Sequence, residues 1–209
     1  MDIYASDEEK GEEIKQWWRD NGRSVVIACV LGAIVIFGGR YWINYTNVQS
    51  EKASQAYQQV TMLLEAENNT AADAITQTLL SEFSATPYAV FTAFEMATLA
   101  VQNKDNESAQ NYLEWVTLNA KLSAHKELAS LRLAQLFLLD AKFEQSLALA
   151  EQAKSTAFSS LWAELKGDVY IAQDNVINAR ESYETALSSL AAGEPRQLIL
   201  KVKLDDVAE

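Results

Sequence analysis

The chain has one histidine and one cysteine, the side chains that most often serve as a base, a nucleophile or a transition-metal ligand. Cys29 lies inside a long apolar stretch, so the polar part of the chain can form no disulfide and no cysteine-based metal site. His125 stands alone in LSAHKEL, so neither a histidine-rich metal site nor a Ser-His or Cys-His pair can be assembled there. We interpret His125 as a residue on the surface of a helix.

Carboxylates are the remaining candidates for chemistry, because they are abundant on the predicted helices. A general acid and base pair needs two carboxylates in an environment that separates their pKa values. Nothing in the spacing isolates two such groups in an apolar setting, so we interpret them as a solvated acidic face. The carboxylates concerned are Glu107, Glu114, Glu144, Glu151, Glu164, Asp168, Glu181 and Glu184.

Composition excludes further classes of function. Beyond the apolar stretch the only glycines, Gly167 and Gly193, are isolated, so no glycine-rich phosphate loop occurs. Lys and Arg number 17 against 29 Asp and Glu, which gives a net charge of -12, and no basic run provides a footprint for nucleic acid. We therefore expect no catalytic residue, no cofactor, no metal site and no nucleic-acid partner, and we predict that the protein is not an enzyme.

The apolar stretch SVVIACVLGAIVIFGGRYWINY begins at Ser24, and residues 25–39 carry no charge. As a helix, residues 25–43 span ~28 Å at ~1.5 Å per residue, close to the ~30 Å hydrocarbon core of a bilayer. We predict a transmembrane helix at 24–43 in preference to a buried core helix, because residues typical of membrane interfaces flank it. These flanking residues are Trp17, Trp18, Arg40, Tyr41, Trp42 and Tyr45.

A cleaved signal peptide is the alternative, and two features oppose it. The preceding segment is long and carries four basic and seven acidic residues, whereas a secretory n-region is short and positive. The following GGRYWINY offers no Ala-x-Ala-like cleavage site, so the stretch is predicted to remain as a signal anchor. Four basic residues precede it and only Arg40 and Lys52 lie between 40 and 60, which places the N-terminus in the cytoplasm and residues 44–209 in the periplasm of a bacterial inner-membrane protein.

Residues 1–23 form a short cytoplasmic segment. Ser6 and Glu9 have the spacing of a capping box, and Ile14, Trp17 and Trp18 share one helical face. We favour a helix on the membrane surface over a docking motif for a cytoplasmic partner. Asn21 and Gly22 are predicted to separate this helix from the span.

Beyond the anchor an all-α fold is predicted, because glycine and proline almost vanish while Ala, Leu, Gln, Glu and Lys dominate. Thr70 and Asp105 are predicted N-caps. In the tail PRQLILKVKLDDV the alternation is typical of a strand, yet a polar-faced capping helix better suits an all-α array. Predicted helices cover residues 50–67, 71–83, 88–102, 106–119, 123–139, 143–154, 158–172 and 176–190.

These helices contain an internal repeat. The segment LAQLFLLDAKFEQSLALAEQA and the segment LKGDVYIAQDNVINARESYETA share one register thirty-three residues apart, and a weaker copy starts at Ala97. The first copy places Ala134, Phe137, Phe143, Ser146, Ala150 and Ala153 where the second places Gly167, Tyr170, Val176, Ala179, Tyr183 and Ala186. The weak copy supplies Ala97, Ala100, Ala109, Leu113 and Val116, with Asn106 breaking the pattern.

This register resembles the tetratricopeptide repeat, in which small residues sit where two antiparallel helices cross and aromatic residues fill the space beside them. The shared positions are therefore predicted to be core. Residues 50–83 are interpreted as a degenerate first unit, with Ala53, Ala56 and Tyr57 facing Ala74 and Leu79. An anchored helical-repeat domain of this kind generally binds peptide segments or proteins through its concave surface.

The whole chain resembles the YfgM family of ancillary SecYEG translocon subunits. The resemblance rests on MDIYASDEEKGEEIKQWWRDNG, the anchor ending GGRYW, SLRLAQLFL and ELKGDVYIAQDNVINARESYETAL. It implies a single-span inner-membrane protein with a periplasmic tetratricopeptide-like domain, a protein that is bound to the translocon and to a membrane-anchored periplasmic chaperone, PpiD. It also implies a chaperone-like role for unfolded secretory proteins and, for some members, a link to a cytoplasmic stress-response regulator. The alternative is an envelope scaffold without contact with translocating chains.

Overall fold

The computed structural model describes residues 7–191 and 193–207. Every regular element in these residues is helical, which confirms the all-α prediction. Ser6 of the predicted capping box lies outside the described residues. The helices are α1 (Asp7–Glu65), α2 (Asn69–Glu82), α3 (Pro87–Gln102), α4 (Asn106–Asn119), α5 (Ser123–Leu139), α6 (Phe143–Glu151), a 3₁₀ turn η1 (Thr156–Phe158), α7 (Ser159–Ala172), α8 (Val176–Ser188) and α9 (Arg196–Asp206).

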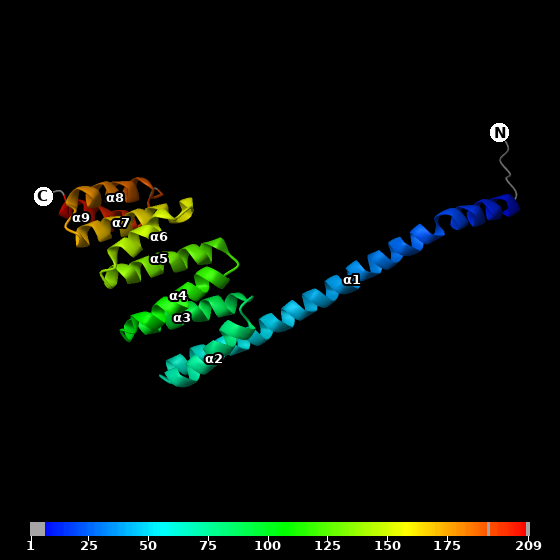
Figure 1. Cartoon of the computed structure of the whole chain (residues 1–209), viewed down its shortest axis with the longest axis horizontal. Helices are drawn as coiled ribbons and strands as arrows, with labels where there is room; N and C mark the ends of the chain where they lie inside the picture. The colour runs from blue at the N-terminus through cyan, green and yellow to red at the C-terminus, as the bar shows by residue number, and fades with distance from the viewer. Residues whose placement is uncertain (1–6, 192, 208–209) are drawn as a thin grey trace. The chain divides into compact units, whose positions relative to one another are not determined.

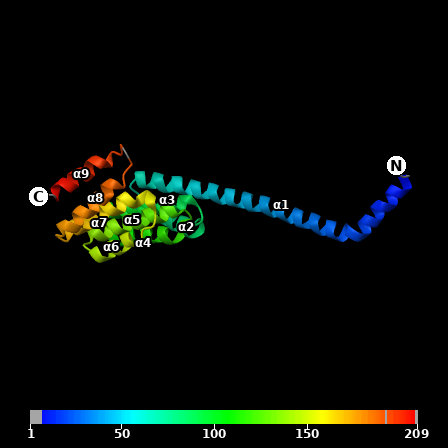
Figure 2. The same ribbon diagram turned by 90° about the horizontal axis from the view of Figure 1, so that it is seen from above.

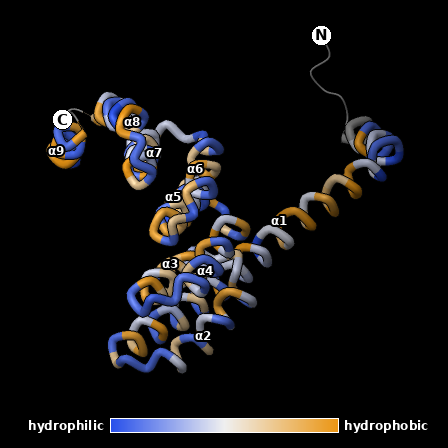
Figure 3. The backbone as a smooth tube through the Cα atoms, turned by 60° about the vertical axis from the view of Figure 1, so that its left-hand side comes forward, coloured by the Kyte–Doolittle hydropathy of each residue, from blue (hydrophilic) through white to orange (hydrophobic). Residues whose placement is uncertain are grey.

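The first of two units ends at Glu51 and consists of the N-terminal part of α1. This part contains an apolar segment long enough to cross a membrane, with a mean hydropathy of 2.0 and 6% of its residues buried. Figure 3 shows the apolar residues following one another along this helix. Within residues 7–191 and 193–207, α1 is the one helix long and apolar enough to span a membrane, and an apolar helix exposed on all sides is stable only in lipid.

The predicted break at Asn21 and Gly22 is wrong, because both residues lie within α1. The Trp18 ring covers Gly22, and a Cβ added at position 22 would lie 3.2 Å from the indole. The Asn21 side chain donates to the Trp17 carbonyl at 3.1 Å. One glycine destabilises a helix by only ~1 kcal/mol relative to alanine, and the long helical segments on both sides of Gly22 outweigh this cost.

The second unit starts at Lys52 and is built from four antiparallel helical hairpins. The C-terminal part of α1 pairs with α2, and the next pairs are α3 with α4, α5 with α6, and α7 with α8. Figure 1 and Figure 2 show α3 to α8 stacked one hairpin after the next. This arrangement is the predicted tetratricopeptide-like solenoid.

Each hairpin turns through the same backbone motif, which recurs every 33 to 37 residues. One non-glycine residue at each turn has φ between 56° and 61°, in the left-handed region. The following residue donates its backbone N–H to the carbonyl five positions earlier, which satisfies one of the last carbonyls of the first helix. The left-handed residues are Glu67, Lys104, Ala141 and Asp174.

At the turns before α2 and α4, a side chain caps the start of the second helix. The predicted N-cap Asp105 is confirmed, because its carboxylate accepts from the Ser108 N–H at 3.1 Å. The predicted N-cap Thr70 is wrong: α2 starts at Asn69, and Asn68 accepts from the Ala71 N–H. Helix α6 also ends at Glu151, three residues before the predicted end, and a 3₁₀ turn precedes α7.

The core is divided among neighbouring helices. Five clusters of buried apolar residues each join consecutive elements, from Ala53 and Val60 of α1 to Leu200 of α9. Each hairpin therefore buries its apolar face on the next, as in other helical repeats.

The C-terminal segment is the helix α9, so the strand alternative is wrong. Leu200 on its buried face, and Val207 directly after it, join the cluster formed by α7 and α8. Leu198 and Val202 are exposed on the opposite side. The expected polar outer face is therefore also wrong, because apolar residues two positions apart point to different sides of a helix.

Candidate partner-binding surface

Small residues hold the paired helices close together. In the last hairpin Gly167 faces the Tyr183 ring so closely that an added Cβ would lie 2.3 Å from Cε1. In the preceding hairpin the Ser146 hydroxyl donates to the Ala134 carbonyl at 2.8 Å. Such contacts fix the angle between the helices of each hairpin, because nothing larger fits between them.

Most of the predicted repeat positions are buried. Phe143, Ala153 and Tyr170 are half-buried, whereas nine others are buried: Ala97, Ala109, Ala134, Phe137, Ala150, Gly167, Ala179, Tyr183 and Ala186.

Two positions assigned to the core are exposed instead. Val176, the first residue of α8, is 48% exposed. Ala74 is also exposed, and Ala72, two residues earlier, is buried in the cluster that contains Ala53. The assignment of Ala74 is therefore wrong, whereas Leu79, which was predicted on the same face, is buried in this cluster.

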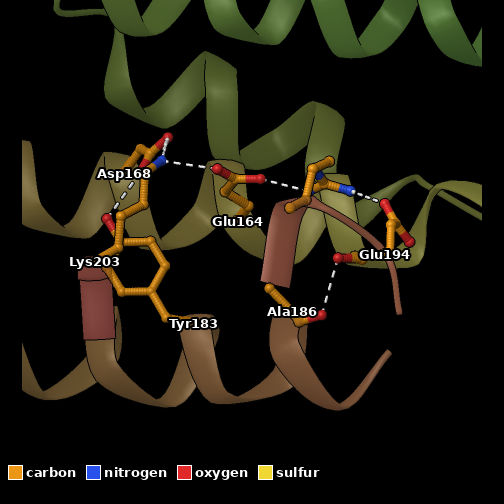
Figure 4. Close-up of polar contacts among 8 residues, drawn as sticks. Glu164, Asp168, Tyr183, Ala186, Glu194 and Lys203 are labelled. Carbon is orange, nitrogen blue, oxygen red and sulfur yellow. Dashed lines mark hydrogen bonds and ion pairs between the residues drawn. The ribbon is translucent and has the colours of Figure 1, made fainter. Parts of the chain in front are cut away.

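A charged network attaches α9 to α7. Lys203 donates to Glu164 at 2.9 Å and to the two carboxylate oxygens of Asp168 at 2.7 and 2.9 Å. Arg196 pairs with the second Glu164 oxygen, and the Tyr183 hydroxyl donates to Asp168 at 2.8 Å. Figure 4 shows Glu164 and Asp168 both directed toward Lys203. The prediction of a solvated acidic face is wrong for these two carboxylates, because α9 covers them.

The network changes the pKa values of its members. Burial raises the pKa of Glu164, but hydrogen bonds from Arg196 and Lys203 outweigh burial and hold that pKa below its ordinary value. Burial lowers the pKa of Lys203, but hydrogen bonds to Asp168 and Glu164 hold it above its ordinary value. Burial, together with the hydrogen bond to Asp168, raises the pKa of Tyr183. The charged forms of Glu164 and Lys203 therefore stabilise the docked helix.

An aromatic cluster lies on the first helices of the first three hairpins. The Phe91 ring of α3 contacts Tyr57 of α1, Tyr88 of α3 and His125 of α5, with ring centroids 5.9 to 6.4 Å apart. Phe91 is 40% exposed. His125 is thus half-buried against an aromatic ring rather than simply solvated, and the cluster presents an apolar surface to solvent.

Next to this cluster lies a carboxylate with an unusual environment. The Tyr57 hydroxyl donates to Glu95 Oε1 at 2.6 Å, whereas Oε2 is buried and has no hydrogen-bond partner. The hydrogen bond to Glu95 raises the pKa of Tyr57. The Arg132 guanidinium lies 4.8 Å from the centroid of the Phe94 ring. The Arg132 guanidinium therefore lies against an aromatic face, and Arg132 forms no ion pair within the described residues.

These side chains line one groove along α1, α3 and α5. A depression of about 630 Å³ is bordered by Tyr57, Phe91, Phe94 and Glu95, and a second of about 270 Å³ is bordered by Val101 and Leu139. The two depressions share Thr98, Gln102 and Arg132. We call them together the first-helix groove. A separate depression of about 580 Å³ over α6, α7 and α8 has a more polar lining, including Lys154, Lys166 and Glu181.

The comparisons with known proteins place this geometry in a family. A family model described as a tetratricopeptide repeat-like domain matches residues 15–209. The chain belongs to this family. Among the described residues of this tetratricopeptide repeat-like protein, no three His, Cys, Asp or Glu side chains come close enough together to hold a metal ion.

Curated relatives match along the full length. The chain is similar to the ancillary SecYEG translocon subunits of Haemophilus influenzae, with 27% identity over 99% of this chain and 100% of the relative, and of Neisseria gonorrhoeae, with 26% identity over the same shares. It is also similar to the ancillary SecYEG translocon subunit of Escherichia coli, with 24% identity over 90% of this chain and 91% of the relative. No solved structure matches the chain. The resemblance to the YfgM family is confirmed.

Sequence reasoning missed the most distinctive residues of this tetratricopeptide repeat-like domain. Glu95 and Arg132 were not singled out, because neither belongs to the repeat register and their neighbours come from other helices. The spacing of Phe91, Phe94 and Glu95 on one helical face was the available signal.

The residues predicted at the membrane interface lie on α1. Trp17, Trp18, Tyr41 and Trp42 are all more than half exposed, and Arg40 is also exposed. Their exposure leaves them free to contact lipid headgroups, which is the role that we propose for them.

Proposed function

We propose that this protein is an ancillary subunit of the SecYEG protein translocon. In this proposal residues 24–43 anchor it once in the bacterial inner membrane, residues 1–23 lie in the cytoplasm and residues 44–209 form a periplasmic domain. The similarity to three named translocon subunits along essentially the whole chain carries the proposal. The larger number of basic residues before the span than after it supports the orientation.

The domain binds a periplasmic chaperone of the PpiD type, unfolded secretory proteins as they emerge, or both. Two features support a binding role rather than catalysis. Repeat hairpins generally bind other polypeptides along a concave surface, and here the exposed Phe91 ring on a first helix lies beside a groove. The anchor confines the domain to the membrane of the channel, so weak contacts suffice at the resulting effective concentration.

Site-specific photo-crosslinking in cells that are actively exporting protein tests this function. A photo-reactive amino acid in place of Phe91, which lines the groove, should crosslink to translocating chains or to a periplasmic chaperone. The same amino acid in place of Ile177, which is 81% exposed on α8 and outside the groove, is the matched control.

The result also separates the proposal from its alternative. Crosslinks from Phe91 to resident envelope proteins alone, with no secretory chain and no chaperone, would favour a membrane-anchored envelope scaffold. Equal crosslinking from Phe91 and Ile177 would contradict a role for the groove.

The orientation is tested by fusions after Glu209. A reporter that fluoresces only in the cytoplasm should be dark there, and a periplasm-dependent phosphatase should be active. The opposite pattern would contradict the proposed topology.

A further inference from the structure

Helix α9 has fewer buried residues than any of the helices α2 to α8. Of its eleven residues only Leu200 is buried, whereas six of the fourteen residues of α7 are buried. The free energy of local opening is lowest where few apolar side chains are buried. We therefore expect α9 to leave α7 and α8 far more readily than the two helices of a hairpin separate.

Charged contacts supply much of the attachment of α9. Lys203 donates to Glu164 and Asp168, and Arg196 pairs with Glu164. These four side chains are only 17 to 32% exposed, so both carboxylates are largely covered by α9. The contacts follow a fixed spacing, in which Arg196, Leu200 and Lys203 lie on the side of α9 that meets two carboxylates four positions apart on α7.

The surface beneath α9 is thus a binding site for one helix, and α9 itself shows which sequence fits it. We call it the α9-binding surface. An apolar residue meets buried residues of α7 and α8, and basic residues on either side of it meet the carboxylates, so both apolar burial and charge select the helix that binds. The α9-binding surface consists of Ala163, Glu164, Asp168, Ala179, Tyr183 and Ala186.

The outer face of α9 is apolar and uncovered. Leu198, Ile199 and Val202 are 71%, 56% and 53% exposed, and they share one face of the helix. A helical-repeat array normally ends in a polar face, which keeps it soluble. An array that ends in an apolar face is instead suited to association at that end.

A second copy of this chain supplies a helix that fits the α9-binding surface by identity. Every contact that α9 makes within one chain can form again between two chains, with no new complementarity required. Helix α8 ends at Ser188 and α9 begins at Arg196, and the seven residues between them reach at most ~25 Å. The C-terminal ends of two copies that exchange α9 must therefore lie close together, which brings a second copy near each apolar outer face.

We infer that two copies of this chain exchange their C-terminal helices, with Lys203 of one copy donating to Glu164 and Asp168 of the other. The exchanged pair is in equilibrium with the closed chain, because both have the same contacts. Anchoring in one membrane favours the pair by raising the effective concentration of one copy near another. This inference goes beyond the proposed function, because it assigns a self-association site.

Charge reversal in two differently tagged full-length copies tests the inference. One copy carries Lys203→Glu and the other carries Asp168→Lys, and both are co-expressed and purified from membranes in a gentle detergent without crosslinker. Within either variant, and between two copies of the same variant, positions 203 and 168 carry like charges. Between the two variants both contacts join opposite charges. Mixed pairs should therefore outnumber pairs of one variant by about 10-fold, the effect of a hydrogen bond to a charged group.

The control replaces Lys203→Glu by Lys201→Glu, the same reversal at an exposed position of α9 that forms no ion pair among residues 7–191 and 193–207. Combined with Asp168→Lys, it should give no excess of mixed pairs. An equal excess with Lys201→Glu, or no excess with Lys203→Glu, would overturn the inference.

Wild-type copies give a measurement that does not depend on the folding of a variant. Two differently tagged wild-type copies should co-purify, and their failure to do so would overturn the inference. Copies that still co-purify equally well when both carry Lys203→Glu would also overturn it, because they associate through another surface. Wild-type protein that co-purifies with the translocon but not with a second copy would refute the exchange alone and leave the proposed function standing.

Discussion

The contact between Gly167 and Tyr183 predicts a large effect from a single methyl group. A Cβ at position 167 would lie 2.3, 2.5 and 2.9 Å from three ring carbons of Tyr183, distances that side chains do not adopt. The ring cannot move away easily, because Tyr183 is 3% exposed and its hydroxyl is bonded to Asp168. The change Gly167→Ala therefore forces the two helices apart or displaces the ring.

The size of the effect follows from three contributions. Alanine in place of glycine stabilises a helix by ~1 kcal/mol. Overpacking a core costs ~1 to 3 kcal/mol, and loss of the hydrogen bond from Tyr183 to the charged Asp168 costs ~1.5 to 3 kcal/mol. The unfolding free energy should therefore fall by about 1.5 to 5 kcal/mol, which corresponds to about 3 to 20 °C for a domain of this size.

Thermal unfolding of the full chain in detergent, followed by circular dichroism, measures the shift. In a Tyr183→Leu background, where the ring is absent, the same Gly167→Ala change should be neutral or stabilising by up to ~1 kcal/mol. A wild-type melting temperature for Gly167→Ala, or an equal loss in both backgrounds, would refute the close contact.

Three further predictions follow from the hairpins and from α9. Ala179→Leu should overpack the buried helix crossing and lower the unfolding free energy by ~1 to 3 kcal/mol. Glu181→Ala, on the solvated side of the same helix, should change the unfolding free energy by less than ~0.5 kcal/mol, and equal shifts in melting temperature for the two variants would show that the register is wrong. Ala141→Gly should raise the melting temperature, since an L-residue in the left-handed region costs ~1 to 2 kcal/mol, and a lowered temperature would contradict the turn geometry. The pKa of Glu164 is lower in the folded protein, so the contribution of Glu164 to folding stability is complete above its ordinary pKa of 4.5 and is lost as pH falls through its pKa in the folded protein. The difference in melting temperature between wild type and Glu164→Gln should therefore shrink in acid. A difference that grows in acid would contradict the network.

Local patterns predicted the hairpins because helix-forming residues dominate each helix and small residues recur where two helices cross. The small residues Ala134, Gly167 and Ala179 recur at fixed offsets, and the crossing of two adjacent helices requires them. The helical content and the family could therefore be predicted from the sequence alone.

The turns were less visible, because the chain adopts the left-handed conformation without glycine. Among the left-handed residues Asp174 is of a type that tolerates this conformation, whereas Glu67, Lys104 and Ala141 give no such signal and backbone hydrogen bonds specify their geometry. The N-cap of α2 was assigned to Thr70 instead of Asn68 for the same reason, because the capping position depends on where the turn ends.

Contacts between distant segments could not be predicted either. Glu164 and Lys203 are 39 residues apart, and only the folding of α9 onto α7 brings them together. The same holds for Tyr57 and Glu95, which are 38 residues apart. Sequence spacing reports neighbours on one helix, whereas these pairs join different helices.

The central claim is that this protein associates with the secretion channel. The most direct test is purification of the tagged full chain from membranes in a gentle detergent without crosslinker, followed by quantitative mass spectrometry. The control replaces residues 24–43 with an unrelated apolar span. We predict that translocon subunits co-purify with the native chain and are reduced with the replaced span, because the anchor supplies proximity to the channel. Native protein that retains neither a translocon subunit nor a periplasmic chaperone would contradict the account and favour the envelope scaffold.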